Sequence, residues 1–255
     1  MFIDSHAHLD DERFDGDREL LISSLKDNKI DIVLNIGADL KTSKASVKLA
    51  QKYDNIFAVV GVHPHDAKDV DENYIQQLRE LAKEEKVVAI GEIGLDYYYD
   101  NSPRDIQRKI FTEQINLAKE LNLPIVIHTR DAAQETFDIL KEAASDGSIK
   151  GVMHCYSGSV EMALEYIKLG FYISIGGPVT FKKSRVSKEV AAAIPLDKLL
   201  IETDSPYLTP EPYRGKRNEP MFVKYTAETI AEVRGISVEE LGEVTSRNVK
   251  ELFGI

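Results

Sequence analysis

Short runs of apolar and β-branched residues recur along the whole chain, with segments of helical spacing between them. Eight such runs occur, at residues 2–8, 30–37, 56–63, 87–93, 124–128, 151–154, 171–175 and 199–204. Strands that alternate with helices form a parallel sheet, and eight such units close into a barrel. The pattern therefore predicts an α/β protein with a (β/α)₈ fold, the TIM-barrel architecture.

Local residues mark the starts of two of the intervening helices. Ser102, followed by Pro103 and Asp105, predicts a cap, a first-turn proline and an early acid. Ser237, followed by Glu240, is typical of a capping box. These signals place helices where the alternation requires them.

The length of the chain and the absence of a linker favour a single domain. The chain has 255 residues, which gives about 32 per strand–helix unit, as expected for one barrel. The rival fold, an open doubly wound sheet, usually has a glycine-rich phosphate loop after its first strand, and none follows His8. No linker or change of composition interrupts the chain, so we expect one domain over residues 1–255.

Composition limits the possible environments and partners. The net charge of −11 argues against a surface that grips nucleic acid by bulk positive charge, although bound cations and a local basic rim could still attract an anion. A single cysteine, Cys155, excludes an intrachain disulfide, and the N-terminus has no basic and apolar leader. We therefore expect a cytoplasmic protein with neither a membrane association nor an obligatory protein partner.

All six histidines fall at or just beyond the C-terminal ends of the expected strands. They are His6, His8, His63, His65, His128 and His154. In a barrel these strand ends form the active-site face. Because residues i and i+2 of a strand share a face, His6 and His8 should point into the barrel mouth together. Imidazole is a common ligand for zinc, iron and manganese.

Carboxylates occupy comparable positions at the ends of two strands. Glu92 lies in the fourth run, and Glu202 and Asp204 lie in the eighth, where they should share a face. Taken singly, each could be an ordinary ion-paired or hydrogen-bonded residue. Together with the histidines they would form a costly group of buried polar side chains unless a cation compensated them.

The ligand candidates suffice for two divalent cations. We assign His6, His8, Glu92 and Asp204 to one cation, and expect Glu92 to bridge to a second that His128 and His154 hold. Two such cations activate a water and clamp an in-line displacement. Asp204 would also be the general base, with Glu92 and His63 in catalytic roles. His63 and His65 could contact the substrate or move a proton, although His65 could equally be a plain loop residue.

Basic residues gather in the loops that follow several strands. Arg130 follows the fifth run, and Arg214, Lys216 and Arg217 follow the eighth. Barrels often bind phosphate in such loops. We interpret these four residues, with His63 and His65, as substrate contacts, while solvated side chains in polar loops remain the alternative.

At these residues the chain resembles the TatD family of metal-dependent deoxyribonucleases. The resemblance rests on ordered motifs across nearly the full length, among them Asp4-Ser5-His6-Ala7-His8, Gly91-Glu92-Ile93-Gly94-Leu95-Asp96 and Glu202-Thr203-Asp204-Ser205-Pro206. It implies an amidohydrolase-type barrel with two divalent cations, Mg, Mn or Zn, and exonuclease-like action on DNA. It also implies His6, His8, Glu92, His128, His154 and Asp204 as metal ligands, with His63 near a substrate phosphate.

Three functions remain open at this point. The preferred one is a phosphodiesterase that acts on DNA, for example by trimming the 3′ ends of single strands. The second is a hydrolase of a small-molecule amide or ester. Many barrels of that type carry a modified lysine in the fourth strand, where it bridges the metals. This chain has Glu92 in that strand, and its Lys86 precedes the strand. The third is a non-enzymatic metal-binding or scaffold protein, which should lack one or more ligands.

Overall fold

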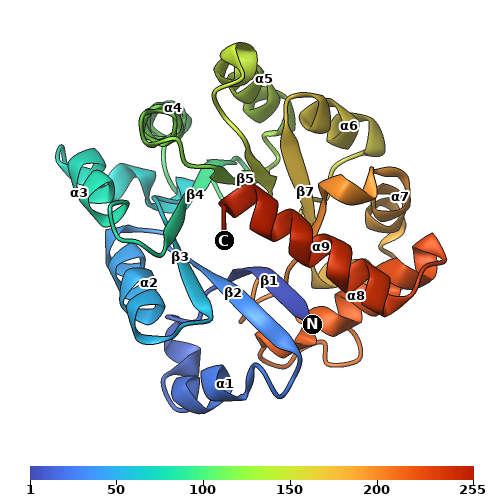
Figure 1. Cartoon of the computed structure of the whole chain (residues 1–255). Helices are drawn as coiled ribbons and strands as arrows, with labels where there is room; N and C mark the ends of the chain where they lie inside the picture. Colours follow the sequence, from blue (N-terminus) through green and yellow to red (C-terminus); the bar gives the residue numbers. More distant parts are fainter. The chain divides into compact units, whose positions relative to one another are not determined.

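Eight strands alternate with helices from one end of the chain to the other (Figure 1). The computed structural model describes residues 1–255. The strands are β1 Phe2–Ala7, β2 Ile30–Ile36, β3 Ile56–Val60, β4 Val87–Asp96, β5 Ile125–Arg130, β6 Gly151–Met153, β7 Phe171–Ile175 and β8 Leu199–Ile201. Each expected run overlaps one strand, although β4 and β5 extend beyond the expected ends at residues 93 and 128, so the alternation predicted from the sequence is confirmed.

Nine α-helices and six short 3₁₀ helices separate or follow the strands. The α-helices are α1 Arg18–Ser24, α2 Leu40–Lys52, α3 Tyr74–Leu81, α4 Arg104–Leu121, α5 Ala133–Ala143, α6 Val160–Lys168, α7 Arg185–Ala193, α8 Val223–Arg234 and α9 Val238–Phe253. The 3₁₀ helices are η1 Glu12–Phe14, η2 Pro64–Asp69, η3 Ala144–Asp146, η4 Gly177–Thr180, η5 Leu196–Lys198 and η6 Pro220–Phe222. None of the helices combines the length and the apolar character that a membrane span requires.

The chain divides into two compact units, each assembled from separate segments. Unit 1 comprises residues 1–35, 154–167 and 172–255, and unit 2 comprises residues 36–153 and 168–171. In unit 1, β1 pairs with β2 and β7 pairs with β8, in both cases parallel. In unit 2, β3, β4, β5 and β6 pair in that order, also parallel. A single domain over residues 1–255 stays a prediction.

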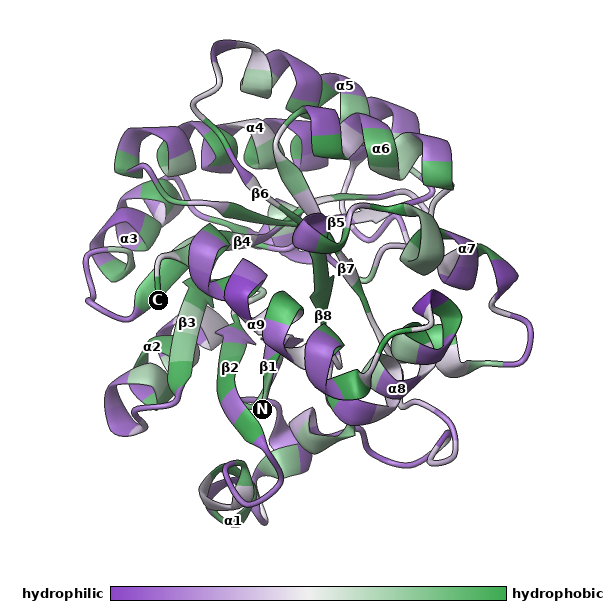
Figure 2. Ribbon diagram, turned by 45° about the vertical axis from the view of Figure 1, so that its right-hand side comes forward, coloured by the Kyte–Doolittle hydropathy of each residue, from purple (hydrophilic) through white to green (hydrophobic).

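Burial explains why these segments are strands and helices. Every residue of β4 is buried, as expected for a strand covered on both faces. Strands and helices differ in the same way in Figure 2, where β3 is coloured as hydrophobic while α5 alternates between hydrophobic and hydrophilic residues. In unit 1, α9 lies against β1, where the Phe2 ring approaches Gly242 so closely that a methyl group there would lie 2.8 Å from it.

The helix-start signals were half correct. Ser237 caps α9, and its side chain accepts the Glu240 amide at 3.0 Å, as predicted. Ser102 does not cap α4: the helix begins at Arg104 with Pro103 as its cap residue. The Ser102 hydroxyl instead donates to the carbonyl of His65 at 2.8 Å. This long-range hydrogen bond replaces the local one, so the capping prediction for Ser102 is wrong.

Candidate metal centre

In unit 1, His6 and His8 project to the same side of the C-terminal end of β1. Their Nε2 atoms lie 3.3 Å apart, which confirms that they share a face. The pairing register with β2 shifts between Asp4 and Ala7, so the strand carries an irregularity where His6 lies. Such bulges re-aim side chains near functional sites. His6 is fully buried.

Asp204 reaches the same pair of imidazoles from the turn that follows β8. Its Oδ1 atom lies 3.4 Å from His8 Nε2 and 3.8 Å from His6 Nε2. The backbone at Asp204 has φ of 59°, a left-handed conformation in which aspartate is several-fold enriched. Two backbone hydrogen bonds fix this turn, from Asp204 N to His6 O at 2.9 Å and from His8 N to Ser205 O at 2.7 Å.

Burial opposes ionisation of Asp204, but the hydrogen bond with His8 and the nearby imidazoles of His6 and His154 outweigh it. Together they hold the pKa of the Asp204 carboxyl below its usual value. The side chain is therefore a carboxylate near neutral pH and can accept a proton.

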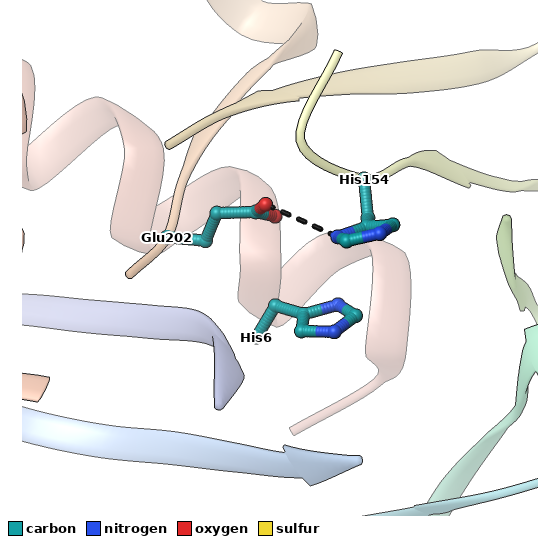
Figure 3. A group of neighbouring side chains, drawn as sticks. All are labelled: His6, His154 and Glu202. Carbon is teal, nitrogen blue, oxygen red and sulfur yellow. Dashed lines mark hydrogen bonds and ion pairs between the residues drawn. The ribbon is translucent and has the colours of Figure 1, made fainter. Parts of the chain in front are cut away.

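His154 and Glu202 complete the group in unit 1 (Figure 3). The His154 ring stacks on His6 with a centroid separation of 4.0 Å, and its Nδ1 atom lies 3.2 Å from Glu202 Oε1. That oxygen also accepts the Cys155 amide at 2.7 Å. The other carboxylate oxygen, Glu202 Oε2, is buried and has no hydrogen-bond partner.

One donor atom from each of His6, His154 and Glu202 lies within 4.8 Å of the others, a spacing that suits a cation. An unpartnered carboxylate oxygen is costly to bury, and a cation would compensate it. The donor set of imidazole and carboxylate therefore fits a divalent metal.

Asp4 supports the base of this group. Its carboxyl group is fully buried and accepts hydrogen bonds from Thr203, from N at 2.9 Å and from Oγ1 at 2.5 Å, and from His6 N at 3.3 Å. Burial raises the pKa of Asp4 to about 8, although the hydrogen bonds from Thr203 oppose the shift. Asp4 thereby ties the end of β1 to the segment that carries Asp204.

In unit 2, Glu92 and His128 lie together at the ends of β4 and β5. His128 Nδ1 is 3.0 Å from Glu92 Oε1, and Glu92 is 4 % exposed. The register between these strands shifts between Ile90 and Ile93, so Glu92 occupies a bulge. Gly94 pairs with His128 at φ of 148°, and a Cβ atom at that position would lie 1.8 Å from the His128 carbonyl oxygen. Only glycine allows this approach.

His63 and His65 approach the same group from the segment after β3. The strand ends at Val60, so His63 caps η2 and His65 lies within it. His63 Nε2 is 3.6 Å from Glu92 Oε1, and His65 Nε2 is 2.9 Å from Asp96 Oδ2. One donor atom from each of His63, Glu92 and His128 lies within 4.8 Å of the others, which again suits a cation.

Asp96 connects the imidazoles of unit 2. It is fully buried at the end of β4, and its Oδ2 atom lies 3.0 Å from His128 Nε2 and 2.9 Å from His65 Nε2. Its Oδ1 atom accepts the amides of Tyr98 and Tyr99 at 3.0 and 2.9 Å. Burial would raise the pKa of Asp96, but the hydrogen bonds from His128, Tyr99 and His65 hold it well below the usual range.

The basic residues expected to bind substrate differ in their surroundings. Arg130 is exposed, with its guanidinium 4.0 Å from the ring centroid of Tyr98 and 4.8 Å from that of Tyr99. Arg214 and Lys216 are also exposed. Arg217 instead binds Asp17 at 2.6 Å and Glu219 at 2.9 Å and covers the Phe14 ring. These partners give Arg217 a structural role within unit 1, and its contact with substrate stays a prediction.

The predicted ligands thus form two groups, one in each unit. Unit 1 brings together His6, His8, His154 and Asp204, and unit 2 brings together Glu92 and His128, with His63 beside them. The bridging role of Glu92 would join residues of the two units and stays a prediction, as does cation binding by each residue.

Sequence reasoning gave no role to Asp96 and left Glu202 outside the ligand set. A signal was available for both. Asp96 follows Glu92 by an even number of residues, and Glu202 precedes Asp204 by two, the spacing that places side chains on one side of a strand.

Comparisons with known proteins agree on one family. The model of the family described as TatD related DNase matches residues 3–254. The uncharacterized metal-dependent hydrolase YabD of Bacillus subtilis (strain 168) is 50% identical over 255 residues, which is 100% of both chains. The uncharacterized metal-dependent hydrolase YcfH of Escherichia coli (strain K12) is 40% identical over 258 residues, covering 100% of this chain and 96% of its own.

Solved structures extend the likeness to the fold. The structure of YJJV, a TatD homolog from Escherichia coli K12, has a TM-score of 0.93 and 28% identity and covers 100% of this chain and 98% of its own. A TatD family hydrolase from Entamoeba histolytica has a TM-score of 0.88 and 26% identity, covering 99% of this chain and 97% of its own. Taken with the two groups of imidazoles and carboxylates at strand ends, these likenesses show that the chain belongs to the TatD-related DNase family and is a metal-dependent hydrolase with a (β/α)₈ barrel fold.

Proposed function

We propose that the chain is a phosphodiesterase that acts on DNA, as an exonuclease on single strands. The observation that carries this proposal is the pairing of carboxylates with imidazoles at the strand ends, as in buried Glu92 with His128 and half-buried Asp204 with His8. Divalent cations can stabilise the negative charge that develops on the oxygens of a phosphodiester during hydrolysis, and these donor sets suit divalent metals. The family's description as TatD related DNase supports DNA as the substrate.

In this proposal His6, His8, His154 and Asp204 would hold a divalent cation in unit 1, and Glu92 and His128 would hold one in unit 2. This differs from the assignment made from the sequence, which gave His154 to the same cation as His128, because the His154 ring stacks on His6. The cation is Mg²⁺, Mn²⁺ or Zn²⁺. When bound, it supplies Lewis-acid polarisation of a phosphoryl oxygen and lowers the pKa of the attacking water.

The chain's own residues then orient the reactants and move the proton. Asp204, which is ionised near neutral pH, accepts the proton of the attacking water. Arg130, Arg214 and Lys216 are exposed and can contact phosphates. Arg130, held between Tyr98 and Tyr99, is the best placed of the three because those exposed rings also offer faces on which a base can stack.

Hydrolysis of a small-molecule amide or ester is less well supported. A bridging lysine in the fourth strand would favour it, but Lys86 directs its Nζ atom to the carbonyl oxygens of Ala50 and Tyr53 at 2.7 and 2.5 Å. The strand offers the carboxylate of Glu92 in its place.

A direct assay separates the two substrate classes. Metal-free protein reconstituted with Mn²⁺ or Mg²⁺ should release nucleotides from a labelled single-stranded oligonucleotide, and a chelator should stop the release. The same preparation should leave a panel of chromogenic carboxyl esters, lactones and amides intact. Turnover of a panel member without release of nucleotides would overturn the DNA proposal while leaving the metal-dependent hydrolase in place.

A further inference from the structure

Tyr207 closes the turn that carries Asp204 in unit 1, and its side chain stays open to solvent. The residue is 46 % exposed, and its ring lies beside the imidazole of His8, with the ring centroids 5.9 Å apart and the planes at 78°. Two hydrogen bonds fix its backbone, from Tyr207 N to Asp204 O at 2.8 Å and from the Asn218 side-chain amide to Tyr207 O at 2.6 Å. The fold therefore holds an exposed aromatic ring next to the candidate metal group of unit 1.

Arg13 covers the ring of Tyr207 with its guanidinium group. The central carbon of this group lies 4.2 Å from the ring centroid, a distance at which a cation and an aromatic ring attract each other. The carbonyl oxygen of Arg13 accepts a hydrogen bond from Arg217 at 2.8 Å, and Arg217 in turn binds Asp17 and Glu219. Arg217 thus helps to fix the segment that carries Arg13.

The charge of Arg13 is compensated within the same cluster. The Asp11 carboxylate accepts hydrogen bonds from Nε and Nη2 of Arg13, both at 2.8 Å, and from the Tyr207 hydroxyl at 3.3 Å. The backbone amide of Asp11 donates to the carbonyl oxygen of His8 at 3.1 Å. Because a guanidinium paired with a carboxylate attracts an anion less than a free one does, this surface suits a flat, neutral group better than a phosphate.

We propose that Tyr207 and Arg13 form a stacking site for an unpaired nucleobase of the substrate strand, and that they favour single strands over paired ends. Unpaired bases stack on aromatic rings and on arginine guanidinium planes in other proteins. A base inside a duplex is already stacked and paired, so it must first leave the helix to occupy such a site. The inference rests on the proposed function, because it requires DNA as the substrate.

An abasic scan measures the interaction between a base and Tyr207. The probe is a labelled single-stranded oligonucleotide with phosphorothioate linkages, which resist hydrolysis, and each nucleotide in turn is replaced by an abasic one. Fluorescence anisotropy gives the affinity of each probe for the wild type, Tyr207→Leu and Tyr207→Phe. At one position the wild type should lose about 5- to 150-fold in affinity, the loss expected when the stacking of one base is removed.

The two variants should respond differently at that position. Tyr207→Phe keeps the ring and loses only the hydroxyl, so it should keep the wild-type penalty. Tyr207→Leu should reduce the penalty to less than about 2-fold, and its preference for the strand over the same strand in a blunt duplex should fall by a similar factor. Comparing penalties in this way isolates the interaction of the base with Tyr207, since a general effect of the substitution on binding cancels.

Tyr53→Leu is the matched control, because Tyr53 also has a cation over its ring, that of Lys52, but lies at the end of α2. It should keep the wild-type penalty. If no position has a penalty that depends on Tyr207, the inference is wrong, and DNA remains the proposed substrate. If the wild type binds no oligonucleotide, the proposed function fails and the inference fails with it.

Photo-crosslinking tests the wild-type protein without a substitution. Iodouracil is placed at the position that the scan of the wild type identifies, the complex is irradiated, and the crosslinked peptide is identified by mass spectrometry. We expect the peptide that contains Tyr207. Crosslinks only to other segments would overturn the inference, and this result can be obtained even if Tyr207→Leu does not fold.

Discussion

His128 Nδ1 lies 3.0 Å from Glu92 Oε1, although the two residues are 36 positions apart in the chain. The bulge in β4 and the close approach of Gly94 to His128 produce this contact. Both features are properties of the backbone of unit 2, so the fold itself positions the donor pair. Such preorganisation is what a metal site requires of its protein ligands.

Replacement of Glu92 by glutamine should remove most of the activity. The change keeps the shape of the side chain but removes the charge beside His128. Replacing a residue that only hydrogen-bonds to a metal ligand already lowers metal affinity or activity by about 10- to 100-fold. Loss of the charge of a ligand itself should therefore lower kcat/KM by more than about 100-fold. Activity on the oligonucleotide and bound metal are measured together. Glu80→Gln, at an exposed residue of α3 that pairs with Lys83, is the control. Full activity in Glu92→Gln would remove this residue from the site.

Replacement of Arg130 by alanine should weaken binding of DNA more than it slows hydrolysis. One lost phosphate contact should raise KM and reduce the slope of log KM against log salt concentration by about 1. Kinetics between low and moderate salt measure both quantities. Arg247→Ala, at an exposed position of α9, should change neither. An unchanged salt slope in Arg130→Ala would show that the guanidinium does not contact phosphate.

Replacement of Asn218 by alanine should destabilise the turn that carries Asp204. The buried Asn218 amide donates to the carbonyl oxygens of Thr203 at 2.8 Å and Tyr207 at 2.6 Å. The variant leaves these acceptors without a donor, at a cost of about 1–3 kcal/mol in the free energy of unfolding. Urea denaturation measures the change. A stability equal to that of wild type would mean that the turn is fixed by its backbone hydrogen bonds alone.

The ion pair of Asp11 with Arg13 should contribute to stability only above strongly acidic pH. Hydrogen bonds from the Arg13 guanidinium, at 2.8 Å, lower the pKa of Asp11 to about 2. A carboxyl with a lowered pKa stabilises the folded state above its unfolded pKa, near 4, and this contribution disappears as the pH falls toward 2. The pair is partly exposed, so Asp11→Asn should cost less than about 1 kcal/mol at pH 6. Unfolding at pH 6 and pH 2 should show a difference between the two proteins only at pH 6.

The positions of the histidines were predictable because they depend on strand order. His6, His8, His128 and His154 lie at strand ends, where the alternation of strands and helices placed them. The even spacing along each strand could have drawn attention to Glu202 and Asp96, but it could not identify their partners. The pairing of Glu202 with His154 and of Asp96 with His65 depends on the register between strands and on turns that no local pattern encodes. Arg217 is a further example. Its position in a loop after a strand suggested a substrate contact, but in the structure its guanidinium donates hydrogen bonds to Asp17 and Glu219.

The account depends most directly on binding of divalent cations by these side chains. Freshly purified protein should therefore be analysed for metals, then stripped with a chelator and titrated with Mn²⁺ while release of nucleotides from single-stranded DNA is followed. We predict that the stripped protein is inactive and that activity returns in proportion to bound Mn²⁺. Protein that takes up no divalent cation under any condition, or that is fully active without one, would contradict the account.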